Sequence, residues 1–263
     1  MERLAIATHQ RDIARHVAFA REYHIGIEIQ VYGYNPTLLD GDWREVVALH
    51  KEQLRGFEGE IAFHGVFYDM SSASVDPRIL SITRDRYLHN LQIAAELGGK
   101  HVVFHANYLH VIRHNAYLED WSRRQVDFWN ELGEQARALG VVIAVENMWE
   151  PNPDVIMDVL DRVDSPWVGA CLDVGHAHLY SSPDIPFSTW LERMKGRLIH
   201  CHINNNRGLY DEHLPLDAEG GIVDYRQVLP MLRALPHQPL VSLEMEKLDY
   251  MARSLEFIRR TGN

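Results

Sequence analysis

The sequence predicts a single (β/α)8 barrel, an α/β fold of the TIM-barrel type, and three observations support this architecture. The chain has 263 residues, 46% of them hydrophobic, which suffices for one large core and is short for two ordinary domains. Short apolar runs alternate eight times with segments of helical periodicity. The connections that follow the apolar runs are longer than those that precede them, as expected when one end of a barrel carries the functional site. We therefore expect one domain over residues 1–263.

The predicted strands are β-branched runs that are apolar on both faces, which is typical of a parallel sheet covered by helices. They occupy residues 4–8, 25–31, 60–65, 100–106, 141–147, 168–174, 197–203 and 239–245. Eight such units in a chain of this length favour closure into a barrel over an open, doubly wound sheet.

The predicted helices show apolar residues at spacings of three and four, the pattern of a helix with one buried face. The clearest runs from Leu118 to Leu139 and ends before Gly140, a residue suited to a left-handed C-terminal cap. The others cover about 11–23, 42–55, 78–97, 153–162, 188–195, 224–234 and 248–260. The longest connections after strands are 66–77, 106–117, 174–187 and 204–223, which a barrel places at one end.

Composition restricts the partners that we expect. The formal net charge of −11 provides no basic surface for a phosphate backbone, so nucleic acid is disfavoured as a partner. Cys171 and Cys201 are the two cysteines, and both lie inside apolar predicted strands, where a cysteine is usually an inert core residue. The sequence shows neither a signal-peptide pattern nor an apolar run of membrane-spanning length, so we expect a cytoplasmic protein without membrane contact. The oligomeric state stays open.

Each of the last six predicted strands finishes with a residue able to bind a metal ion. The local sequences are FHG, FHANY, VEN, LDVGH, HIN and LEM, and the loop after the seventh strand adds DEH. Because the ends of parallel barrel strands meet at one rim, we expect these residues to be neighbours. Imidazole together with carboxylate suits zinc, manganese or iron better than calcium. The candidate ligands are His64, His105, Glu146, Asp173, His176, His202, Asp211, His213 and Glu244.

Each of these residues, taken alone, has an alternative role. A histidine at a strand end can simply pack, and Asp173 or Glu244 can cap the next helix or pair with an arginine. For these alternatives to explain the pattern, they would have to apply by coincidence to all nine candidates on the same rim, which makes them a poor explanation. His200 precedes His202 by two positions and could support it, whereas Glu28, at the end of the second strand, receives no role. Seven histidines lie outside the rim and are expected at the surface: His9, His16, His24, His50, His89, His114 and His237.

Four residues in the connections after strands are candidates for contact with a small-molecule substrate: Arg207, Tyr68, Asn107 and Trp149. For the aromatic residues, packing at the barrel mouth is the alternative, and for Arg207 it is a solvent-exposed loop position. The substrate that we expect is small, with or without a phosphate group.

The runs VGACLDVGHAHLY and HINNNRGLYDEHLPL resemble the xylose-isomerase-like barrels, a superfamily that includes sugar isomerases and epimerases and the endonuclease IV enzymes of AP endonuclease family 2. The resemblance covers nearly the whole chain. In the epimerase branch, positions that match Glu146, Asp173, His202 and Glu244 hold one metal ion, and the two glutamates move a proton beside a carbonyl. In the endonuclease branch, positions that match all nine candidates hold three ions, and Glu146 matches the residue that bridges two of them.

Three functional hypotheses follow. The leading one is a phosphoester or phosphodiester hydrolase of a small molecule that uses two or three zinc or manganese ions, because an epimerase has little use for His64, His105, Asp211 and His213 as ligands. The alternative is a sugar or sugar-phosphate isomerase or epimerase with Glu146 and Glu244 as its acid and base pair. The third is a metal-binding barrel without catalysis. DNA is disfavoured as a substrate, since the loops after the third and seventh strands lack the expected basic residues.

Overall fold

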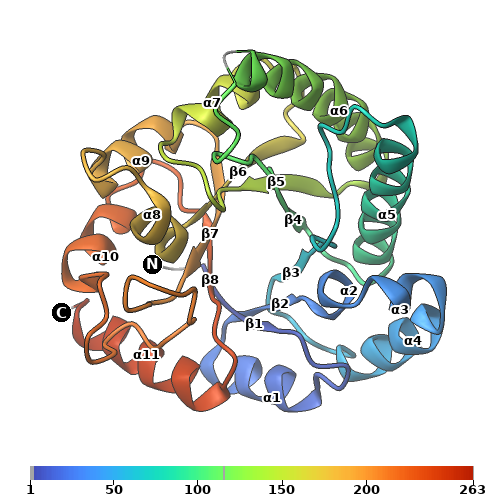
Figure 1. Cartoon of the computed structure of the whole chain (residues 1–263). Coiled ribbons are helices and arrows are strands. Elements are labelled where there is room, and N and C mark those ends of the chain that lie inside the picture. Colours follow the sequence, from blue (N-terminus) through green and yellow to red (C-terminus); the bar gives the residue numbers. More distant parts are fainter. Residues whose placement is uncertain (1–2, 115, 263) are drawn as a thin grey trace.

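A closed barrel of parallel strands forms the centre of the computed structural model, which describes residues 3–114 and 116–262 (Figure 1). Each strand pairs with the next one along the chain, and the last pairs with the first in parallel register, Leu4 opposite Val241. The strands are β1 (Leu4–Thr8), β2 (Gly26–Ile29), β3 (Ile61–His64), β4 (His101–His105), β5 (Val142–Glu146), β6 (Val168–Asp173), β7 (Leu198–Ile203) and β8 (Leu240–Leu243). The predicted (β/α)8 fold is confirmed.

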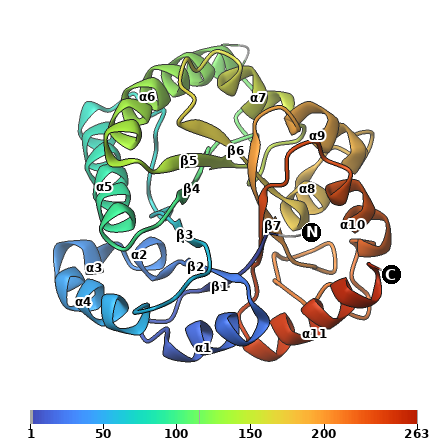
Figure 2. The same cartoon turned by 180° about the vertical axis from the view of Figure 1, so that it is seen from behind.

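The helices form a ring around the barrel, as the two opposite views show (Figures 1 and 2). In chain order they are α1 (Ala14–Tyr23), α2 (Val31–Tyr34), α3 (Pro36–Asp40), α4 (Trp43–Gln53), α5 (Pro77–Glu96), α6 (Tyr117–Leu139), α7 (Asp154–Leu160), α8 (Val174–Tyr180), α9 (Phe187–Met194), α10 (Tyr225–Arg233) and α11 (Leu248–Arg260). Within the described residues, no helix is both long enough and apolar enough to cross a membrane.

Three short helices, α2, α3 and α8, were not predicted from the sequence. Segment 174–187 was predicted as a connection, but it begins with the seven residues of α8. Helices α2 and α3 contain four and five residues, too few for the spacing of apolar residues to repeat. Their formation depends on local contacts, such as the backbone bond from Gly33 N to the carbonyl oxygen of Gln30 at 2.8 Å.

The main apolar core lies between the barrel and its helices. Tyr87 on α5, Phe104 on β4 and Trp129 on α6 are buried there, and the rings of Tyr87 and Phe104 stack at a centroid distance of 4.1 Å. Burying aromatic side chains of this size contributes strongly to stability. The barrel interior is different, because its small apolar clusters leave room for buried polar side chains, among them Glu28 and His200. Glu28 on β2 and His200 on β7 meet there, with Oε2 of Glu28 2.8 Å from Nε2 of His200.

Candidate metal centre

Four buried side chains from the last four strands converge on one point at the rim. Glu146 ends β5, Asp173 ends β6, His202 lies on β7, and Glu244 follows β8 directly. One ligand atom from each lies within 4.8 Å of the others. His202 Nδ1 is 2.8 Å from Glu146 Oε1 and 3.3 Å from Glu244 Oε2. Three carboxylates and one imidazole suit a divalent cation such as Mn²⁺ or Zn²⁺, and we call these four residues the central group.

A second group of possible ligands shares Glu146 with the central group. His64 Nε2, from β3, lies 3.1 Å from Glu146 Oε2, and His105 Nε2, from β4, lies 3.2 Å from the same oxygen. The other oxygen of this carboxylate faces His202. Glu146 therefore turns one oxygen toward each group, the geometry of a carboxylate that can bridge two cations.

A third group lies beside the central one, on α8 and the loop after β7. Asp211 Oδ2 is 3.0 Å from His176 Nε2 and 3.1 Å from His213 Nε2. The structure thus brings together, in three adjoining groups, all nine residues that the sequence singled out as candidate ligands.

Asp173 has a structural role in addition to its place in the central group. Its Oδ1 accepts a hydrogen bond from the backbone N of His176 at 2.6 Å and so caps α8, while Oδ2 accepts one from Asn204 Nδ2 at 2.8 Å. The helix cap considered as an alternative role is therefore present. The same motif requires Gly175, because a Cβ atom there would lie 2.1 Å from Asn204 Oδ1.

Charges in the site compensate one another. Although burial lowers the pKa of His213, the negative charges of Glu244 and Asp211 raise it to about 9 overall. Burial raises the pKa of Asp173 to about 6. Burial acts in the same direction on Asp211, but hydrogen bonds from His176 and His213 outweigh it and hold its pKa well below the usual range. Neighbouring positive charge therefore stabilises the Asp211 carboxylate, and a bound cation would supply the same stabilisation to the Asp173 carboxylate, which burial destabilises.

A cavity of about 540 Å³ opens above the three groups. Three of the four residues suggested for substrate contact line it, namely Tyr68, Asn107 and Trp149. Tyr34 and Phe67 add to its aromatic wall, with ring centroids 5.2 Å apart. Within the described part of the chain, no lysine or arginine lines this cavity. Its walls therefore suit a polar, uncharged ligand with an apolar face better than an anion.

Arg207 and several histidines lie elsewhere than the sequence suggested. Arg207 is about half exposed, pairs with Glu212, and does not line the cavity. His9 follows β1 and lines the cavity, so the strand-end rule applied to β1 would have found it. His16 and His50 were expected at the surface and are buried, and His50 Nδ1 lies 3.0 Å from Tyr32 Oη. His50 has hydrogen-bond partners at both ring nitrogens, and a polar residue buried in this way looks like a surface residue in the sequence.

Glu150 is a buried carboxyl outside the three groups. Its Oε2 accepts a hydrogen bond from Met148 N at 2.6 Å, whereas Oε1 has no hydrogen-bond partner among the described residues. Burial raises its pKa from 4.5 to about 7. The folded protein therefore binds a proton that the unfolded chain releases between these two pH values, and this carboxyl makes the folded state less stable as pH rises through that window.

We expect Glu150→Gln to flatten that pH dependence. Relative to the variant, the wild type should lose about 3 kcal/mol of unfolding free energy between pH 4.5 and pH 8, because a pKa unit corresponds to about 1.4 kcal/mol. Urea unfolding at both pH values measures the difference, with Glu119→Gln at an exposed position as the control. An equal difference between wild type and Glu150→Gln at both pH values would show that folding does not raise the pKa of Glu150.

Comparison with known proteins gives one family and a consistent set of barrels. A family model described as a xylose isomerase-like TIM barrel matches residues 19–261. The TTHB071 protein from Thermus thermophilus, in a structure obtained after soaking with ZnCl2, is 28% identical, with a TM-score of 0.79 over 99% of this chain and 98% of that chain.

Two other solved structures share the fold at lower identity. A D-tagatose 3-epimerase-like protein is 22% identical, with a TM-score of 0.82 over 98% of this chain and 96% of that chain. D-allulose 3-epimerase from Methylomonas sp., in complex with D-allulose, is 16% identical, with a TM-score of 0.75 over 98% and 96% of the two chains. At these identities the likeness establishes a common architecture.

Proposed function

Because the chain belongs to the xylose isomerase-like TIM-barrel family, with residues 19–261 matched, we propose that it is a divalent-metal-dependent isomerase or epimerase of a small sugar. The observation that carries the proposal is the convergence of Glu146 and Glu244 on His202 at the floor of an aromatic, polar cavity. The names of the structural neighbours, which include sugar epimerases, favour this function over the hydrolase that the sequence suggested first.

The chemistry needs two carboxylates near one carbon atom. A divalent cation held by the central group would supply Lewis acidity, which makes a proton on the carbon beside a carbonyl easier to remove. Glu146 approaches from β5 and Glu244 from the end of β8, so one can take this proton and the other can return one. Gln30 Nε2 donates to Glu244 Oε1 at 2.6 Å and so fixes the orientation of this carboxylate.

The cavity favours a neutral sugar over a sugar phosphate. Its described lining offers no lysine or arginine for a phosphate, while Tyr34, Phe67, Tyr68 and Trp149 offer ring faces for the apolar side of a sugar. Asn107 and His9 add polar groups that can bind hydroxyls.

Proton exchange with solvent tests this proposal. We expect the Mn²⁺-loaded protein to incorporate deuterium from D2O beside the carbonyl of at least one ketose in a panel of ketopentoses and ketohexoses, as measured by NMR. A panel without any exchange, together with hydrolysis of bis-nitrophenyl phosphate, would contradict it.

A phosphoester hydrolase remains the second candidate, because Glu146 Oε2 lies within 3.2 Å of both His64 and His105. An epimerase with one ion does not need this arrangement, whereas a cluster of ions suits phosphoester cleavage. The number of ions per chain separates the two functions, since one ion supports epimerisation and two or three support hydrolysis.

A further inference from the structure

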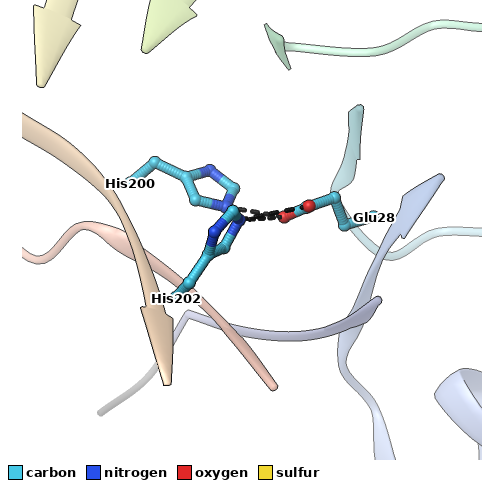
Figure 3. A group of neighbouring side chains, drawn as sticks. All are labelled: Glu28, His200 and His202. Atoms are coloured by element: carbon cyan, nitrogen blue, oxygen red, sulfur yellow. Dashed lines mark hydrogen bonds and ion pairs between the residues drawn. The ribbon is translucent and has the colours of Figure 1, made fainter. Parts of the chain in front are cut away.

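Beneath the central group, Glu28 reaches across the barrel interior from β2 to β7 (Figure 3). These two strands are not neighbours in the barrel, so the contact spans its interior. The Glu28 carboxylate is fully buried, with both oxygens 3.1 Å from His202 Nε2 and one oxygen 2.8 Å from His200 Nε2. It does not line the cavity and so does not contact a substrate bound there.

Gln30, the first residue after β2, links Glu28 to a second member of the central group. Its Nε2 donates to Glu28 Oε1 at 3.0 Å and to Glu244 Oε1 at 2.6 Å. Glu28 and Gln30 thus contact Nε2 of His202 and Oε1 of Glu244, whereas Nδ1 and Oε2 of the same two residues lie 3.3 Å from each other.

An imidazole nitrogen that carries a proton can donate a hydrogen bond but cannot bind a metal ion at the same time. A proton on Nε2 that is donated to a carboxylate leaves the lone pair of Nδ1 free for a cation. Nδ1 of His202 is the nitrogen that faces Glu146 and Glu244, at 2.8 and 3.3 Å. Contact with Glu28 on the opposite side therefore selects the tautomer that this geometry requires.

We propose that Glu28 is a positioning residue that makes Nδ1 of His202 the ligand nitrogen, and that Gln30 holds Glu244 in register with it. In this arrangement Glu28 on β2 and Gln30 just after it are not ligands themselves, but each aligns one of the four ligands. The inference rests on the metal site of the proposed function and is independent of which reaction that metal serves.

The tautomer is measured first in the wild type, with Zn²⁺ alone as the probe. In protein with ¹⁵N-labelled histidine, we expect the His202 signal, assigned by its loss in His202→Gln, to show a proton on Nε2 and the metal on Nδ1. The reverse assignment would overturn the inference without any variant at Glu28.

Zn²⁺ affinity measured by calorimetry provides the second test. We expect Glu28→Gln to weaken binding about 10- to 100-fold, the usual effect of losing the partner of a ligating histidine. Glu150→Gln is the matched control, because it makes the same substitution at a buried position outside the central group, and it should stay within about twofold. Unchanged Zn²⁺ affinity in Glu28→Gln would overturn the inference and leave the proposed function intact. If the wild type shows no proton exchange with any ketose while Glu28→Gln still weakens Zn²⁺ binding, the proposed function is wrong and the inference stands.

Discussion

Glu146→Gln is expected to reduce turnover at least about 1,000-fold, within the range by which a positioned acid or base accelerates a reaction. The substitution keeps the size of the side chain but removes the basic oxygens. One of these oxygens faces His202 and the other faces His64 and His105, so this residue connects two of the three groups. Deuterium exchange into a ketose, normalised to the bound metal, measures the loss of proton transfer separately from the loss of metal.

The control for this variant is Glu212→Gln, which alters another glutamate of the cavity wall. Glu212 pairs with Arg207 and belongs to none of the three groups, so we expect its loss to change turnover less than about tenfold. If Glu146→Gln retains the turnover of the wild type on every substrate, both catalytic hypotheses are wrong. The remaining hypothesis is then the barrel that binds metal without catalysis.

The candidate ligands were predictable because of the geometry of a parallel barrel. Once eight apolar runs are recognised as strands, their ends share a rim, and residues as distant in sequence as His64 and Glu244 become neighbours. For residues at strand ends, this prediction does not require knowledge of loop conformation. Asp211 and His213 lie in the loop after β7, where the run DEH identified them by residue type, and the strand-end rule alone does not fix their position.

Contacts across the barrel and along the loops were not predictable in this way. Glu28 obeys the strand-end rule, but its partners His200 and His202 lie on a strand that is distant both in sequence and in barrel order. Sequence periodicity indicates which side chains of a strand point into the barrel, but not which side chains of the opposite strands they contact. Arg207 forms an ion pair with Glu212 in the same loop. The spacing of residues in the sequence does not predict such a contact within an irregular loop.

His202→Gln and His213→Gln form a matched pair of substitutions that tests which group holds the essential ion. His202 belongs to the central group, whereas His213 belongs to the group with His176 and Asp211. We expect His202→Gln to weaken ion binding by more than about 100-fold and to abolish proton exchange, since losing a ligand costs more than losing the partner of a ligand. We expect His213→Gln to keep one ion per chain and to reduce turnover less than about tenfold.

The two substitutions replace the same side chain by the same residue, so general effects of replacing a histidine at the rim are shared between them, although His202 is fully buried and His213 is partly exposed. His213 Nδ1 lies 2.9 Å from the carbonyl oxygen of Glu244, so its loss also disturbs the segment after β8, and thermal unfolding of both variants accounts for this. The opposite result is equally informative. If the wild type holds two or three ions and His213→Gln loses one of them together with all cleavage of bis-nitrophenyl phosphate, the third group takes part in the reaction and hydrolysis replaces epimerisation as the function. Metal analysis and both assays on the same preparations therefore decide between a barrel that uses four of its nine candidate ligands and one that uses all of them.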